Sequence, residues 1–121
     1  MSQERVKIGK KGEQLAYEYI LRQGYTVLER NFRCKLGEID LIAGDRNMVV
    51  FLEVRTKSST ACGPAYNSVT PRKQQHVKRT ALFYIAQRNL VNTQFRFDVI
   101  GITLNLSNGT HTLDHIQNAF C

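Results

Sequence analysis

The sequence predicts an α/β fold, with a mixed central β-sheet flanked by α-helices in the order α-β-β-β-α-β-β. Near the N-terminus, apolar residues recur at helical spacing. Two β-rich runs then meet at a short linker containing Gly, Asp and Asn, at 44–47. A second helical stretch from Thr70 leads into two more β-rich runs. At 121 residues, the chain is expected to form one domain, 1–121.

The first helix is predicted from about Lys7, after a basic and partly disordered start, and Gly24 is expected to end it. Glu13 lies at the edge of its apolar stripe, where a carboxylate is usually solvated or paired with a neighbour such as Arg5 or Lys10. The stripe consists of Ile8, Gly12, Leu15, Ala16, Tyr19 and Ile20.

The runs 37–43 and 50–57 are predicted to form a β-hairpin. If Arg46-Asn47 is its tip, Asp40 lies opposite Glu53 on the same face of the sheet. Two carboxylates side by side on rigid strands are costly unless a cation neutralises them. A hard divalent ion such as Mg²⁺, with Mn²⁺ as an alternative, takes oxygen ligands of this kind.

The same register places Glu38 opposite Arg55, with Lys57 two residues further along the same face. Fixed cations beside a metal stabilise negative charge that develops on a phosphate, so the hairpin is a candidate phosphodiester site. The alternative is a surface ion pair between Glu38 and Arg55, with the other two carboxylates on a solvated face.

The flanking segments are assigned from composition. Residues 25–30 are predicted to form the first strand and 31–36 a connector. The segment 58–70 is predicted to be a loop at the mouth of the site, mobile without nucleic acid.

The second helix is predicted to begin with Thr70 as N-cap and Pro71 at the first helical position. Apolar residues turn inward from it, namely Val77, Ala81, Tyr84 and Ile85. Its cations either meet phosphate near the helix N-terminus or form an ordinary solvated face. They are Arg72, Lys73, His76, Lys78 and Arg79.

The last two strands are predicted at 94–104 and 110–116, joined by a turn at Asn108-Gly109. Arg96 and Asp98 share a face, either as a pair supporting the site or, as we prefer, as a structural pair. The histidines lack zinc-ligand spacing and are expected to be ordinary polar residues.

Composition limits the partners and the compartment. Seventeen Lys and Arg against ten Asp and Glu give a net charge of +7, which favours a polyanion and also serves solubility. Three scattered cysteines indicate neither a disulfide framework nor a zinc site. No apolar run approaches the roughly 20 residues of a membrane span, so a cytoplasmic protein without a membrane partner is expected.

Several motifs together resemble the bacterial YraN family. They are Gly9-x-x-Gly12-Glu13-x-x-Ala16, Gly37-Glu38-Ile39-Asp40-Leu41-Ile42-Ala43, Phe51-Leu52-Glu53-Val54-Arg55 and Arg96-Phe97-Asp98-Val99. The pattern of Asp and Glu-x-Lys on neighbouring strands is similar to the restriction-endonuclease-like nuclease superfamily, which includes archaeal Holliday-junction resolvases. The resemblance implies a restriction-endonuclease-like sheet and a Mg²⁺-dependent nuclease acting on DNA, with branched or structured DNA as one candidate substrate. A resolvase-like role implies a homodimer.

Carried onto this chain, the resemblance implies that Asp40 and Glu53 bind the metal, with Glu13 as an outer or second-site ligand. Arg55, Lys57 and Lys73 would stabilise phosphate charge. The nucleic-acid-binding residues are then expected to be Lys10, Lys11, Arg72, Lys73 and Lys78. The superfamily pattern has Lys where this chain has Arg55, a permanent cation that cannot accept a proton. That departure keeps open a second function, a non-catalytic nucleic-acid-binding or adaptor domain. A third is a small protein-interaction module.

Overall fold

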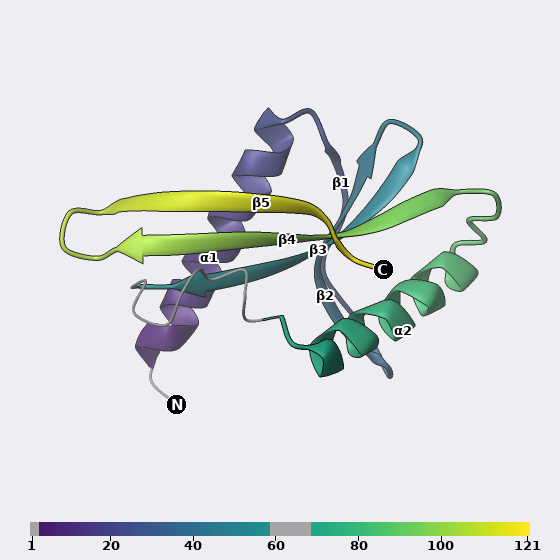
Figure 1. Cartoon of the computed structure of the whole chain (residues 1–121), viewed down its shortest axis with the longest axis horizontal. Coiled ribbons are helices and arrows are strands. Elements are labelled where there is room, and N and C mark those ends of the chain that lie inside the picture. Colours follow the sequence, from purple (N-terminus) through teal and green to yellow (C-terminus); the bar gives the residue numbers. More distant parts are fainter. Residues whose placement is uncertain (1–2, 59–68) are drawn as a thin grey trace.

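A five-stranded mixed sheet lies between two helices in the computed structural model, which describes residues 3–58 and 69–121 (Figure 1). The predicted fold class and element order are confirmed. The elements are α1 (Gln3–Arg22), β1 (Thr26–Cys34), β2 (Gly37–Asp45), β3 (Met48–Lys57), α2 (Pro71–Gln87), β4 (Gln94–Asn105) and β5 (Thr110–Phe120). Most of the loop predicted at 58–70 lies outside the described residues.

The strand order is β1-β2-β3-β4-β5, so neighbours in sequence are neighbours in the sheet. All pairs are antiparallel except β3 and β4, which run parallel and are connected through α2. A parallel pair needs such a crossover, because a tight turn reverses the chain.

Each helix covers one face of the sheet and closes its own apolar core. Ala16 and Ile20 of α1 pack with alternate residues of β2, β3 and β4, among them Leu41, Leu52 and Ile100. On the other face, α2 packs with Ile42, Phe51 and Phe97 through Val77, Ala81 and Tyr84. Period-2 alternation along the strands therefore decides which helix each strand side chain meets.

The first helix is longer than predicted. It begins at Gln3, since the early Gln, Arg and Lys residues are good helix formers even where no apolar stripe requires a helix. Gly24 follows its end with a φ of +89°, as expected of a C-terminal glycine. Gly12 faces the sheet so closely that a Cβ there would lie 1.8 Å from Thr56 Oγ1.

The connector predicted at 31–36 is wrong, because β1 continues to Cys34. Its last residues pair with β2, Phe32 with Ile39 and Cys34 with Gly37, which leaves only a tight turn between the strands. Charged residues suggested a loop, but on an edge strand they point to solvent in alternation with apolar ones.

The predicted start of α2 is confirmed: the Thr70 hydroxyl accepts a hydrogen bond from Lys73 N, and Pro71 opens the helix. This cap fixes where the first turn of α2 begins. The turn at Asn108-Gly109 and the return strand are also confirmed, with β5 extending to Phe120.

Candidate functional site

The register of the central hairpin is the predicted one. Pairing runs from Asp45 with Met48 to Leu41 with Leu52, and Arg46 adopts a φ of +59° in the two-residue tip. The regular ladder ends at Leu41 and Leu52, one position before Asp40 and Glu53. The site is thus placed by the turn, because a two-residue tip fixes every pair behind it.

At Asp40 and Glu53, backbone amides donate hydrogen bonds to carboxylate oxygens instead of to the carbonyls of the neighbouring strand. The amide of Asp40 donates to Glu53 Oε2 at 3.4 Å, and the amide of Val54 donates to Asp40 Oδ2 at 2.7 Å. Glu53 shares its face of β3 with Phe51, on the α2 side of the sheet, whereas Asp40 lies between Ile39 and Leu41, which pack in different cores. Glu53 is only 1% exposed, so the solvated-face alternative does not hold for it.

The predicted pairing of Glu38 with Arg55 is wrong, because the regular ladder between the two strands ends at Leu41 and Leu52. Glu38 instead forms a 3.0 Å ion pair with Arg33 across β1, and both side chains are exposed. Arg55 Nε is buried and has no hydrogen-bond partner among the described residues. Glu38 therefore pairs with Arg33 and not with Arg55.

Lys73 reaches the carboxylates from the first turn of α2. Its Nζ lies 3.4 Å from Glu53 Oε1, and its side chain is 30% exposed. Within the described part of the chain, Glu53 Oε1 makes no hydrogen bond, so this long ion pair is its polar contact there. Such a distance leaves the carboxylate poorly compensated for its burial.

A pocket of about 530 Å³ opens beside the two carboxylates, between the N-terminal halves of both helices and the end of β3. It collects residues that are far apart in sequence. Of the predicted site residues, Glu13, Asp40, Arg55, Lys57 and Lys73 line it. Glu53 does not line it, but contacts two of these residues: it accepts a hydrogen bond from the Asp40 amide and forms the ion pair with Lys73.

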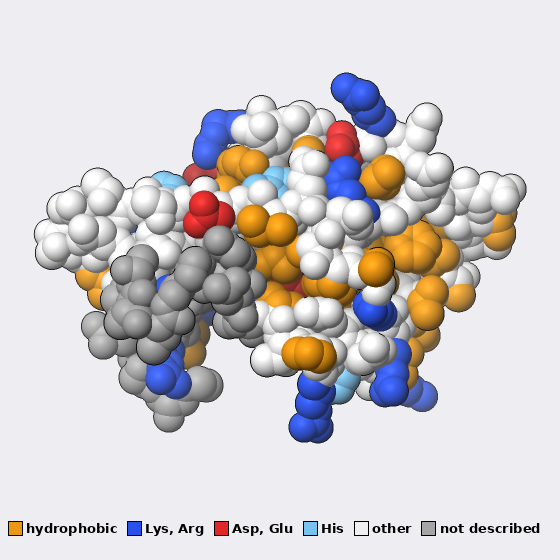
Figure 2. Space-filling view, viewed as in Figure 1, with side chains coloured by type: hydrophobic (Ala, Val, Ile, Leu, Met, Phe, Trp, Pro, Cys, Tyr) orange, Lys and Arg blue, Asp and Glu red, His pale blue; other side chains and the backbone are white. Residues whose placement is uncertain are grey.

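The remaining predicted cations are not brought into this pocket. Lys10, Arg72 and Lys78 do not line it. Lys11 lines a separate hollow of about 120 Å³ with Leu106 and Thr110, near the turn between β4 and β5. Figure 2 shows Lys and Arg side chains along the lower margin of one face, over α2.

Burial and mutual repulsion perturb the acids of the site. Burial, and then the neighbouring charge of Asp40, raises the pKa of Glu53 to about 7. Burial also raises the pKa of Asp40, against the lowering effect of the Val54 amide and of Lys73. The pKa of Glu13 is raised by burial and then by Asp40 and Glu38. All three shifts indicate too little positive charge around the carboxylates.

Asp40 and Glu53 could hold a divalent cation. Within residues 3–58 and 69–121, no group of three Asp, Glu, His or Cys side chains could hold one together, so Glu13 does not complete a third direct ligand. Mg²⁺ is commonly bound through one or two carboxylates, and water and substrate oxygens supply the rest. Two features of Glu53 are compatible with such a cation: its Oε1 has no hydrogen-bond partner among the described residues, and its pKa is raised to about 7.

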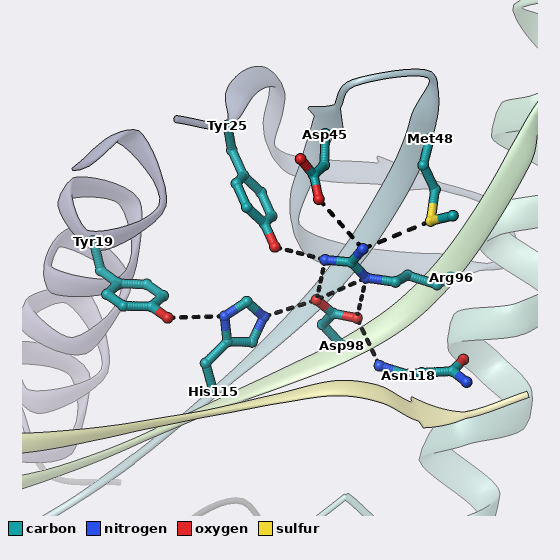
Figure 3. A network of polar contacts seen from close by, with 8 residues as sticks. All are labelled: Tyr19, Tyr25, Asp45, Met48, Arg96, Asp98, His115 and Asn118. Carbon is teal, nitrogen blue, oxygen red and sulfur yellow. Dashed lines mark hydrogen bonds and ion pairs between the residues drawn. The ribbon is translucent and has the colours of Figure 1, made fainter. Parts of the chain in front are cut away.

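A second polar cluster was only partly foreseen (Figure 3). Arg96 Nε donates to Asp98 Oδ1 at 3.0 Å, and Asp98 is fully buried. His115 Nε2 lies 2.7 Å from Asp98 Oδ2, while its Nδ1 lies 3.0 Å from the Tyr19 hydroxyl. Arg96 also donates to Tyr25.

His115, expected to be an ordinary polar residue, has a structural position in this network that the sequence did not reveal. Its side chain is 7% exposed and links α1 to β4 through Tyr19 and Asp98. The register of β4 and β5 places it opposite Ile100, and no local motif reveals that pairing. None of these network residues lines the pocket, which favours the structural interpretation of Arg96 and Asp98.

No helix in the described part of the chain is long and apolar enough to cross a membrane.

Known proteins resemble this chain over most of its length. The model of the uncharacterised protein family UPF0102 matches residues 12–102. A UPF0102 protein of Clostridium botulinum (strain Hall) is 48% identical over 114 residues, covering 93% of each chain. One from Clostridium acetobutylicum is 45% identical over 94% of this chain and 93% of its own. One from Caldicellulosiruptor saccharolyticus is 40% identical, over 94% and 97%. The chain belongs to family UPF0102, the YraN family that its motifs resemble.

Proposed function

We propose that this protein is a Mg²⁺-dependent nuclease that hydrolyses phosphodiester bonds in DNA, with branched or structured DNA among the candidate substrates. The observation that carries the proposal is the contact between buried Glu53 and half-buried Asp40, beside a pocket lined with cations. Burying two adjacent carboxylates without full compensation destabilises a fold, so a ligand that restores the balance is expected.

Asp40 and Glu53 would hold the metal, with Glu13 across the pocket as an outer ligand through water. A divalent cation held there supplies Lewis-acid polarisation of a phosphate oxygen. The protein contributes rigidity, since both acids sit on paired central strands and are fixed by the Asp40 and Val54 amides.

The cations of the pocket have separate positions. Lys73 is next to Glu53 and can turn to a phosphate oxygen when the carboxylate takes another partner. Arg55 and Lys57 follow on the same face of β3 and line the path along which a backbone would leave the site. Fixed positive charges at these points stabilise negative charge that develops during phosphoryl transfer.

A second candidate function is a non-catalytic nucleic-acid-binding domain, which Arg55 favours. The guanidinium stays charged and cannot serve as a proton acceptor, whereas it can still bind a phosphate. The net charge of +7 supports nucleic-acid binding under either proposal.

Cleavage assays on a panel of substrates test the proposal. The panel consists of linear duplex, single strand, flap and four-way junction, with Mg²⁺ or Mn²⁺ and with EDTA. The variants are Glu53→Gln and Asp40→Asn, which remove charge at almost constant shape. The matched control is Glu38→Gln, because Glu38 lines the same pocket but is exposed and paired with Arg33.

We expect divalent-dependent cleavage that drops at least 100-fold in Glu53→Gln and Asp40→Asn and changes little in Glu38→Gln. Retained cleavage in the first two variants would refute the assignment of the metal ligands. Binding that weakens steeply with salt, with no cleavage of any substrate, would select the binding domain instead.

A further inference from the structure

The strand β5 forms an edge of the sheet, and its surroundings differ in charge from the rest of the molecule. All 17 Lys and Arg residues lie within residues 1–96, and residues 97–121 contain none. The two acids there are Asp98, which is buried, and Asp114, which is exposed. In Figure 2 the left end of the molecule, where β4 turns into β5, carries almost no charged side chains.

The two edges of the sheet are built differently. On β1, the exposed edge carries Arg30 and Arg33, its register shifts between Val27 and Glu29, and Asn31 has a φ of +53°. Charges and irregularities of this kind prevent another strand from pairing with an edge. On β5, the stretch Thr110–Ile116 has no Lys, Arg or Pro.

That stretch is also regular. It pairs residue by residue with β4, from Thr110 with Asn105 to Ile116 with Val99. The irregularity comes only afterwards, where the register shifts and Asn118 has a φ of +52°. Among residues 3–58 and 69–121, no other strand pairs with the outer side of these seven regularly paired residues.

We propose that a second copy of this chain docks on β5, with the two Thr110–Ile116 stretches antiparallel and a two-fold axis through Leu113. Two copies each carrying +7 repel one another over most of their surfaces. The stretch Thr110–Ile116 adds no lysine or arginine of its own to that repulsion, and Lys11 of α1 lies beside only its first residue, Thr110. This proposal is independent of the proposed nuclease activity.

The register follows from symmetry. Leu113 is the centre of the regular stretch, so an axis there pairs the whole stretch with itself, and Thr112 faces Asp114 of the partner. Moving the axis to Asp114 would set two carboxylates opposite each other, which disfavours that register. No residue of Thr110–Ile116 lines the site pocket, so the pocket stays open in the dimer.

Two measurements on the full chain test this interface. Sedimentation velocity at micromolar concentrations is expected to give twice the 13.9 kDa mass of one chain. Disulfide crosslinking tests the register in a background with Cys34, Cys62 and Cys121 replaced by Ser. We expect Leu113→Cys to form linked dimers, because residues facing each other across antiparallel strands have Cα atoms about 4.5–5.5 Å apart.

Gln117→Cys is the matched control on the same strand. In the proposed register its two copies stand eight positions apart, about 27 Å along the strands, far beyond the reach of a disulfide. A monomeric wild type, or crosslinking of Gln117→Cys as strong as that of Leu113→Cys, would overturn the proposal.

Discussion

The substitution Glu53→Gln is expected to stabilise the protein at pH 8 in the absence of divalent cations. The pKa of Glu53 rises from an ordinary 4.5 to about 7 in the folded state. The folded state therefore holds this proton more tightly than the unfolded state does. As pH rises from about 4.5 through 7, ionisation of Glu53 costs folding stability, and above pH 7 that cost is complete.

The size of the effect follows from the two pKa values. The rise in the pKa of Glu53 from 4.5 to about 7 corresponds to about 3 kcal/mol of lost folding stability, because a shift of one pKa unit is worth about 1.4 kcal/mol. Glu53 is 1% exposed, so solvent screens this cost little. For a chain of this length, about 3 kcal/mol is equivalent to about 10 °C in Tm.

Thermal unfolding at pH 5 and pH 8 in EDTA measures the effect. We expect Glu53→Gln to exceed wild type in Tm by about 10 °C at pH 8 and by much less at pH 5. Glu38→Gln is the control and is expected to move little, because Glu38 is exposed. A Glu53→Gln variant that is less stable than wild type at pH 8, or an advantage independent of pH, would refute the reasoning.

Three further outcomes are expected. Mg²⁺ should raise the Tm of wild type at pH 8 and leave that of Glu53→Gln nearly unchanged, which differential scanning calorimetry can measure. Gly12→Ala should cost about 1–3 kcal/mol in urea unfolding, because the new methyl group meets Thr56, whereas Gly9→Ala, with open space around it, should stabilise by about 0.5–1 kcal/mol. Asp98→Asn should cost about 3–5 kcal/mol in the same assay, because Arg96 loses the carboxylate that compensates its charge; a cost below about 1 kcal/mol would contradict this.

The hairpin that carries the candidate site could be predicted because its determinants are local. A two-residue tip and strict alternation fix which residues face each other, and the structure has the predicted register. The end of the ladder at Leu41 and Leu52 could not be predicted in this way. It depends on two backbone amides that donate hydrogen bonds to carboxylate oxygens, and on the ion pair that Glu38 forms with Arg33 of β1.

Contacts between distant elements were harder to predict. Lys73 was placed near the site by resemblance, and its reach to Glu53 depends on where the Thr70 cap starts α2. The contact between His115 and Asp98 depends on the register of β4 and β5, which no short motif specifies. In each case the deciding quantity is the relative placement of two elements, whereas sequence patterns report on one.

The two buried acidic clusters of this protein make the strongest argument for function at one of them. Burial raises the pKa of Asp98, but hydrogen bonds from His115, Arg96 and the Asn118 amide outweigh it and lower the pKa below its ordinary value. The fold can therefore compensate a buried carboxylate in full where only stability is at stake. At Glu53 the cations stand further off, and its pKa is raised to about 7. Among the described acids, raised pKa values occur at Glu13, Asp40 and Glu53, which lie at or beside the cationic pocket, and this supports the cation-binding role proposed for that pocket.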